Sequence, residues 1–402
     1  MKFGGSSVAT SEKMKWVAKK VIAERKAGHR VVVVVSAPGD TTDDLIAMAQ
    51  EITPNPDARE MDMLLSTGEQ MSIALLSMAI KAQRYSAISL TGHQVGIITD
   101  KAHTRARITS IVPTKLEAEL KKEKIVIVAG FQGINSEDEI TTLGRGGSDL
   151  SAVALAAVLK ADLCEIYTDV TGVYTTDPRV VRDARRIERI SYDEMLEMAG
   201  SGAQVMQARS IEVAKKYGVD IYVLSTYEQN KTGTLITKEV PRMEDVVVSA
   251  VAFDKNQVKV TLTDVPDQPG IAAVLFGALA KQGINVDMII QSAARNGNND
   301  ISFTVTRVDL PKTLTITKKV KEKLSAGNVV YDDKIAKISI IGVGMRSHPG
   351  VAAKMFKSLA DNKINIEMIS TSEIKISCVI REEKIKKAAT VLHRTFGLDK
   401  AS

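Results

Sequence analysis

The stretch IVIVAGFQGINSEDEITTLGRGGSDLSAVALAAVLKADLCEIYTDV, residues 125–170, holds two strand-length apolar runs separated by a glycine-bearing loop and a helical segment. The runs lack the polar alternation of a half-exposed strand, so they predict strands buried on both faces. The same order appears earlier, where a helical pattern from about residue 11 to 28 precedes VVVVVSAPG at 31–39. Further helices at 69–82 and 114–122 and a strand at 86–92 continue it. We therefore predict an α/β fold with a mostly parallel sheet sandwiched by helices.

An internal repeat marks the second half of the chain. PDQPGIAAVLFGALAKQGINVDMIIQ at 266–291 returns eighty residues later as RSHPGVAAKMFKSLADNKINIEMIST at 346–371, with about half of the positions between 269 and 289 identical. Each copy contains a Pro-Gly loop, an amphipathic helix, a turn and a strand, which predicts two small α+β units near 258–328 and 336–402. The expected domains are 1–240 and 241–402, with the boundary at KEVPRMED, residues 238–245.

Composition narrows the class of protein. The 54 basic and 48 acidic residues give a net charge of +6, but they are interleaved along the chain, and only 4% of residues are aromatic, so nucleic acid is not expected as a partner. Cys164 and Cys378 lie far apart in apolar runs, and the five histidines lack metal-ligand spacing. No apolar run reaches the length of a membrane span, and the amino terminus lacks the apolar core of a signal peptide. These features predict a cytoplasmic protein without a membrane partner.

Glycine-bearing loops follow several of the predicted strands. They gather at the carboxyl ends of a parallel sheet, where ligands bind. In LGRGGSD, Gly146 and Gly147 leave backbone amides open before a helix, and Arg145 offers a planar fork for a carboxylate. The alternative is an ordinary loop in which Ser148 caps the helix and Asp149 offsets its dipole.

Three other segments contain candidate binding residues, and each residue also has an ordinary structural interpretation. KFGGSS at 2–7 is either a strand-to-helix turn or a phosphate cradle, and Lys2 favours the cradle. Glu69 is either a ligand or a first-turn dipole partner of a helix. The polar loop YTDVTGVYTTDPR at 167–179 is either a long surface loop or, closed by a turn at 177–179, a cover for a purine.

Taken together, KFGGSS, LSTGEQ, AGFQG, TTLGRGGSD, YTDVTGVYTTDPR and the duplicated units resemble the aspartate kinases, which join an amino acid kinase domain to a tandem of ferredoxin-like ACT domains. The resemblance implies that ATP phosphorylates L-aspartate to 4-phospho-L-aspartate, the first step toward lysine, threonine and methionine. It also implies Mg²⁺, held mainly through ATP. Because the β-carboxylate is ionised at neutral pH, the reaction needs charge neutralisation rather than a general base.

The resemblance also assigns roles to individual residues. The implied catalytic residues are Lys2, Arg145 and Asp149, the last of which would organise the lysine. The implied ATP-binding residues are Lys2, Gly4, Gly5, Ser6, Thr168, Asp169, Tyr174 and Arg179. The implied aspartate-binding residues are Thr42, Glu69, Phe131, Arg145 and Ser148. The implied effector-binding residues of the ACT tandem are Asp267, Gly270, Asn285, Gln291, Asn365 and Ile366.

Regulation and assembly follow from the same resemblance. The expected effectors are lysine, threonine or both, and the expected assembly is a homo-oligomer or a complex with a separate regulatory subunit, for which Met243 would be an internal start. One departure is that only Met1 precedes Lys2, so the strand that positions the lysine is expected to be shortened or the chain truncated. Two rival functions remain open at this point: phosphorylation of another amino acid such as glutamate, and amino-acid sensing without kinase activity.

Overall fold

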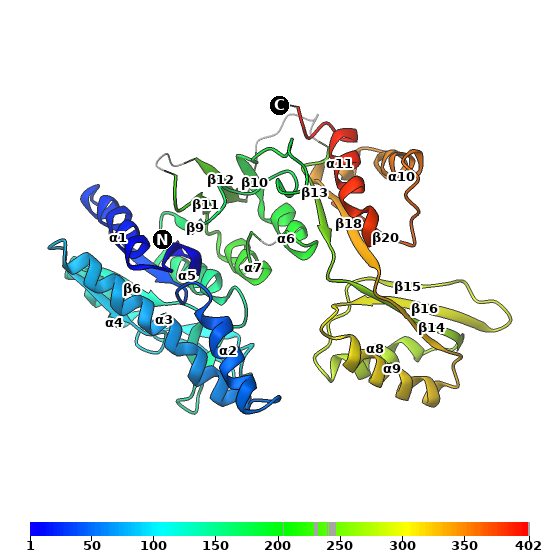
Figure 1. Cartoon of the computed structure of the whole chain (residues 1–402), viewed down its shortest axis with the longest axis horizontal. Helices are drawn as coiled ribbons and strands as arrows, with labels where there is room; N and C mark the ends of the chain where they lie inside the picture. The colour runs from blue at the N-terminus through cyan, green and yellow to red at the C-terminus, as the bar shows by residue number, and fades with distance from the viewer. Residues whose placement is uncertain (204, 229–231, 239, 241–246, 401–402) are drawn as a thin grey trace. The chain divides into compact units, whose positions relative to one another are not determined.

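The computed structural model describes residues 1–203, 205–228, 232–238, 240 and 247–400. These residues form two compact units (Figure 1). The first unit comprises residues 1–173, 186–199 and 204–241, and the second comprises 174–185, 200–203 and 242–402. Much of the predicted boundary segment, and Met243 with it, lies outside the described residues.

The first unit is built on a sheet whose described strands are parallel, apart from the antiparallel pair β11 and β12. In spatial order the strands are β10 (Arg189–Ser191), β12 (Gly233–Thr237), β11 (Ile221–Ser225), β9 (Cys164–Thr168), β1 (Lys2–Phe3), β2 (Val32–Val35), β6 (Ile125–Ala129) and β3 (Ala87–Leu90). The predicted mostly parallel α/β sheet is confirmed, and the two-residue strand β1 occupies its middle.

Helices cover both faces of this sheet. They are α1 (Ser11–Lys26), α2 (Thr41–Ile52), α3 (Ala58–Lys81), α4 (Thr114–Lys121), α5 (Gly147–Leu159), α6 (Tyr192–Gly200) and α7 (Ala208–Tyr217). Phe3 is fully buried in a core with Val17 and Val21 of α1 and Leu76 of α3. Because neighbouring side chains of a strand point to opposite faces, Lys2 faces the other side, where α5 lies.

Helix α1 begins at a side-chain cap, since the Thr10 hydroxyl accepts a hydrogen bond from the Lys13 N–H. Helix α3 is longer than expected and begins at Ala58. Among the described residues it is the helix whose length and composition would suit a membrane span, and half of its most apolar stretch is buried in the structure. That burial is typical of a core helix.

A second, smaller sheet of the first unit was not predicted. Its order is β5 (Ile108–Ile111), β4 (Ile97–Thr99), β7 (Gln132–Ile134) and β8 (Ile140–Thr142). Strands β7 and β8 form a hairpin directly after Phe131 and directly before the LGRGGSD loop. The hairpin therefore joins the AGF turn to the LGRGGSD loop and fixes the position of both beside the start of α5.

The second unit confirms the duplicated α+β units. One sheet has the order β15 (Ile289–Gln291), β16 (Asn298–Val305), β14 (Val258–Pro266) and β17 (Val329–Asp332), with α8 (Ile271–Ala280) and α9 (Leu310–Leu324) side by side on one face (Figure 1). The other has the order β13 (Ala250–Asp254), β18 (Ile335–Ile341), β20 (Lys375–Arg381) and β19 (Met368–Thr371), packed against α10 (Val351–Asp361) and α11 (Ile385–Thr395). Both sheets are antiparallel throughout.

Residues 174–185 pack with the second unit although they precede the expected boundary by more than fifty residues. The Val251 N–H donates to the Thr175 carbonyl oxygen, and the Thr175 hydroxyl lies 2.9 Å from His393 Nε2 of α11. Val181 is buried in the core of the second repeat. The two compact units therefore cannot be separated by a cut at one position of the sequence.

Candidate active site

Lys2 and Asp149 form the most enclosed charged pair at the carboxyl end of β1. The lysine Nζ lies 2.6 Å from Asp149 Oδ1, and the two side chains are 12% and 10% exposed. Asp149 stands in the first turn of α5, so the helix fixes the carboxylate and the carboxylate fixes the lysine. A cation held in this way is positioned before any ligand arrives, which is the condition for electrostatic catalysis.

The turn after Lys2 has no room for a side chain at Gly5, and a side chain at Gly4 would stand against the lysine. A Cβ atom on Gly5 would lie 2.7 Å from the carbonyl oxygen of Ala37, while a Cβ on Gly4 would lie 3.6 Å from Lys2 Nζ. The Gly39 N–H donates to the Gly5 carbonyl oxygen at 3.0 Å, which joins this turn to the loop after β2. The glycines therefore leave backbone open beside the ammonium group, as a phosphate cradle requires.

Ser6 and Ser7 are held by residues that the sequence did not single out. The Ser6 carbonyl oxygen accepts from Lys13 Nζ at 2.9 Å and from the Tyr227 hydroxyl at 3.0 Å. The Ser7 and Thr226 hydroxyls lie 2.6 Å apart. Thr226 and Tyr227 directly follow β11, the neighbour of β9, so the gathering of strand ends at one edge is a signal that could have found them.

Glu69 lies in the middle of α3, which excludes the first-turn dipole role. Its side chain is buried, and Oε1 accepts a hydrogen bond of 3.0 Å from the Ala37 N–H. Burial raises the pKa of Glu69 to about 7, although the Ala37 amide opposes the shift. Within the described structure Oε2 is buried and has no hydrogen-bond partner. A buried carboxylate oxygen in this condition is suited to receive a cationic group of a ligand.

Phe131 and Ser148 meet where the AGF turn contacts the start of α5. Phe131 has a φ of 68°, a left-handed conformation that is uncommon for a bulky residue, and its N–H donates to Ser151 Oγ. A Cβ on Gly130 would lie 2.7 Å from the side chain of Ser148. Backbone strain of this kind is often retained at ligand sites.

The beginning of α5 differs from the plain-loop alternative. Gly146, with a φ of 74°, is the N-cap residue, and it provides no side-chain hydrogen bond. Ser148 is buried inside the first turn, so it does not cap the helix. The positive end of the α5 dipole consequently faces the same region as Lys2.

Arg145 stands apart from this buried set. Its side chain is 90% exposed and pairs with Asp43 of α2 at 2.9 Å. Its carbonyl oxygen accepts from Gln207 Nε2 at 2.7 Å, which anchors the loop but leaves the guanidinium on the surface. Thr42, the neighbour of Asp43, is partly buried at the start of α2. The structure thus brings Lys2, Asp149 and the glycine turn together, whereas the Arg145 side chain lies outside this group.

The residues expected around the nucleotide are divided between the two units. Thr168 ends β9 in the first unit and Asp169 directly follows it, and the Thr168 hydroxyl donates to Asp169 Oδ1. Tyr174 and Arg179 belong to the second unit. Arg179 is exposed and donates two hydrogen bonds of 3.0 Å to Asp177, which closes the predicted turn.

The residues expected to bind effectors occupy corresponding positions in the two repeats. Asp267 and Gly270 lie in the Pro-Gly loop before α8, and the Asp267 carboxylate accepts from Asn299 Nδ2 at 3.1 Å. Asn285 follows α8, and Gln291 ends β15. In the second repeat, Asn365 and Ile366 follow α10 in the turn that corresponds to the one at Asn285. Asn285, Gln291 and Asn365 are exposed.

Among the described residues, no group of three or more His, Cys, Asp or Glu side chains has the geometry of a metal site. The expectation that a magnesium ion is held mainly through a nucleotide stays a prediction.

Comparison with known proteins adds a family context. The model of the amino acid kinase family matches residues 1–225, and models of the ACT domain match residues 259–324 and 338–396. An aspartokinase of Pseudomonas aeruginosa is 51% identical over 400 residues, which cover 99% of this chain and 97% of that protein. The crystal structure of E. coli aspartokinase III in complex with aspartate and ADP has 27% identity and a TM-score of 0.84, and the match covers 98% of both chains. The same enzyme in complex with lysine and aspartate has 28% identity and a TM-score of 0.76, again with 98% of both chains covered.

Proposed function

Because the chain belongs to the aspartokinases of the amino acid kinase family, we propose that it transfers the γ-phosphoryl group of ATP to the β-carboxylate of L-aspartate. The product would be 4-phospho-L-aspartate, at the start of lysine, threonine and methionine synthesis. The observation that carries the proposal is the Lys2–Asp149 pair beside the open glycine turn. The ADP in a solved relative of 98% coverage supports the use of a nucleotide.

Lys2 and the turn at Gly4 and Gly5 would hold the transferring phosphoryl group. The ammonium group neutralises charge on its oxygens, and the backbone amides of Gly5 and Ser6 donate hydrogen bonds, while the Gly4 amide donates to the Tyr167 carbonyl oxygen. Asp149 orients the lysine through the 2.6 Å contact. Magnesium bound to ATP would neutralise further negative charge on the phosphates. Thr168 and Asp169 would contribute to the nucleotide site from the end of β9, with Tyr174 and Arg179 as further nucleotide contacts.

Aspartate would bind through both of its charged ends. The unpartnered Oε2 of Glu69 supports binding of the α-ammonium group. Arg145 would bind a substrate carboxylate after exchanging its exposed partner Asp43 for the ligand, and an exposed ion pair costs little to break. The remaining aspartate contacts would be Thr42, Phe131 and Ser148.

The chemistry needs no general base. A β-carboxylate with a reference pKa near 3.9 is already a nucleophile at neutral pH. The barrier arises from bringing two anions together, and a buried cation with helix and turn amides lowers that barrier by positioning and neutralisation. The position of Asp149 in the first turn of α5 supports a role in positioning the lysine.

We further propose that end-product amino acids inhibit the enzyme through the ACT tandem in the cytoplasm, with lysine, threonine or both as effectors. The lysine complex of a solved relative supports the first of these ligands. Asp267, Gly270, Asn285 and Gln291 of one repeat, with Asn365 and Ile366 of the other, would provide the effector contacts. Association through the same domains, in a homo-oligomer or with a regulatory subunit, is part of this proposal.

The test is ADP release by the purified chain with Mg²⁺-ATP and L-aspartate, with L-glutamate as the matched substrate control. Turnover with aspartate alone supports the proposal, and turnover that prefers glutamate assigns another substrate. Absence of ATP turnover with either substrate assigns the chain to sensing. Repeating the assay with lysine and threonine tests regulation: a raised requirement for aspartate supports it, and unchanged aspartate affinity contradicts it.

A further inference from the structure

A buried carboxylate of the first unit joins three segments of the chain. Asp62 of α3 is fully buried, and the proposed catalysis does not use it. Its carboxylate lies 2.8 Å from His103 Nδ1, and it accepts hydrogen bonds from the Thr104 N–H and the Thr142 hydroxyl. His103 and Thr104 lie in the turn between β4 and β5, while Thr142 ends β8. A buried charge must keep such partners, so Asp62 fixes α3, the turn and β8 relative to one another.

Helix α3 connects this carboxylate to Glu69. The two residues are two helical turns apart, so both buried carboxyl groups share one face of the helix. Between them, the Ser66 carbonyl oxygen accepts a hydrogen bond of 3.0 Å from Gln132 Nε2 of β7. A shift of α3 at Asp62 would therefore move Glu69 relative to the hairpin of β7 and β8, because the intervening turns move as one helix.

The loop that carries Arg145 is tied to the same carboxylate from the other side. Thr142 directly precedes this loop, and its carbonyl oxygen accepts a hydrogen bond of 2.9 Å from the Ala106 N–H. A Cβ atom on Gly144 would lie 3.3 Å from the Thr104 carbonyl oxygen. The turn between β4 and β5 therefore supports the backbone directly before Arg145.

A further set of charged contacts holds His103 in place. Its Nε2 lies 3.4 Å from Glu139 Oε2, and Glu139 Oε1 accepts a hydrogen bond of 3.0 Å from Arg59 Nε of α3. Hydrogen bonds from Asn135 and Arg59 lower the pKa of Glu139, so this carboxylate stays ionised beside the imidazole. These contacts close a ring from α3 through the hairpin and the turn back to α3. The Asp62 network comprises Arg59, Asp62, His103, Thr104, Glu139 and Thr142.

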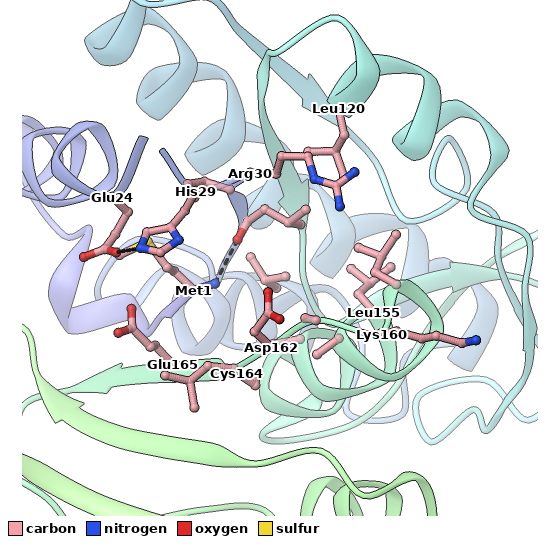
Figure 2. Close-up of a pocket in the computed structure, with 18 of the residues that line it drawn as sticks. Met1, Glu24, His29, Arg30, Leu120, Leu155, Lys160, Asp162, Cys164 and Glu165 are labelled. Atoms are coloured by element: carbon pink, nitrogen blue, oxygen red, sulfur yellow. Dashed lines mark hydrogen bonds and ion pairs between the residues drawn. The ribbon is translucent and has the colours of Figure 1, made fainter. Parts of the chain in front are cut away.

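A cavity of about 580 Å³ in the first unit is separate from this network. It lies at the amino ends of β2 and β9, where Figure 2 shows Met1 beside Cys164 and Glu165. None of the residues of the Asp62 network lines it. The contacts of the network therefore act on the segments that they join and not on the wall of this cavity.

We propose that Asp62 and His103 are positioning residues for the aspartate site, which hold Glu69 and the backbone before Arg145 at a fixed separation. This role rests on the proposed function, in which Glu69 and Arg145 bind opposite charged ends of aspartate. A small misplacement of such groups weakens binding and turnover strongly. The turn after Lys2 is held by the loop after β2, so the nucleotide site should be affected less.

The test compares variants of the full chain that differ in one partner of the buried carboxylate. Thr142→Val removes the hydroxyl donor, and Thr142→Ser keeps it. We expect Asp62→Asn and Thr142→Val to raise the KM for L-aspartate about tenfold or more while the KM for Mg²⁺-ATP changes by less than about twofold. Thr142→Ser should keep the wild-type values. Ile80→Ala, which opens the core at the other end of α3, controls for a general loss of stability and should leave both KM values unchanged. An equal rise in both KM values, or no rise in either, would overturn the proposal.

Amide exchange tests the positioning whether or not the protein turns over aspartate. The backbone amides of Leu143 and Gly147 are hydrogen-bonded at the two ends of the loop around Arg145, so they report on its position. In Asp62→Asn and Thr142→Val we expect both amides to exchange at least about tenfold faster, while the amides of β6 keep their wild-type rates. Unchanged exchange at both loop amides would overturn the proposal. Faster exchange in a chain that does not phosphorylate aspartate would support the positioning of the loop and contradict the proposed function alone.

Discussion

Replacing Glu69 by glutamine should stabilise the first unit at alkaline pH while weakening its binding of aspartate. Burial raises the pKa of Glu69 from 4.5 to about 7. Between these values the folded protein keeps a proton that the unfolded chain has released, so the free energy of unfolding falls as pH rises. The difference amounts to about 3 kcal/mol above pH 7 and disappears below about pH 4.5. Glutamine does not titrate, so the free energy of unfolding of the variant does not fall with pH through this position.

The assay is urea unfolding followed by the fluorescence of Trp16, the single tryptophan of the chain, which reports on the first unit. Any fixed effect of the amide cancels when the variant and the wild type are compared at two pH values. We expect the stability of Glu69→Gln relative to wild type to rise by about 2.5 kcal/mol between about pH 5 and pH 8. In parallel, the KM for aspartate should rise much more than the KM for ATP, because the neutral amide attracts an ammonium group less strongly.

Glu119 of α4 provides a control of opposite sign. Hydrogen bonds from Lys122 and Lys124 lower the pKa of Glu119 to about 2. Its stabilising contribution is complete above the unfolded pKa of about 4.5, so Glu119→Gln should be less stable than wild type by the same amount at both pH values. If Glu69→Gln behaves like this control, with a difference that is independent of pH, the buried carboxyl is not neutral in the folded protein and the reasoning fails.

Two further substitutions test the phosphate turn and the second unit. Gly5→Ala should lower kcat/KM at least tenfold, because the added methyl would lie 2.7 Å from the Ala37 carbonyl oxygen, whereas Gly277→Ala in α8 meets no atom within 4 Å and should leave activity unchanged. Asp287→Asn should destabilise the second unit by about 3 kcal/mol in chemical denaturation, since it leaves the buried Lys337 ammonium without a counter-charge and with the Gly200 carbonyl oxygen as its remaining partner, and Lys337→Met should cost less. Equal costs for these two would show that the buried charge is not the dominant factor.

The parallel sheet was predictable because its strands are apolar over their whole length. Runs such as 31–35 and 125–129 fit only where both faces are covered, and the structure places them side by side as β2 and β6. The repeat likewise predicted two α+β units. The small hairpin sheet was not predictable, since its strands have three or four residues and lie in a polar segment that reads as loop.

The residues alone left two readings of the glycine turn and of Asp149, and the link between Lys2 and Asp149 was expected from the resemblance. The structure places these two side chains 2.6 Å apart beside the turn. The partner of Arg145 was not predictable, because Asp43 of α2 is brought near it by the fold and not by sequence proximity. Tyr227, which holds Ser6, could have been found from its place at the end of β11. The division of the 167–179 loop was missed as well. Val181, which is buried in the core of the second repeat, and Val180, which is partly buried against it, were a signal that the segment continues into another core.

The most direct test of the account is the activity of Asp149→Asn beside that of Lys2→Met, measured as ADP release at saturating Mg²⁺-ATP and L-aspartate. If the carboxylate serves to hold the catalytic ammonium, both variants should fold with the wild-type Trp16 transition, and each should lose on the order of 10²-fold or more in kcat. The double variant should lose little more than Lys2→Met alone, because the two residues act as one unit. Wild-type turnover by either single variant would contradict the claim that this pair carries out phosphoryl transfer.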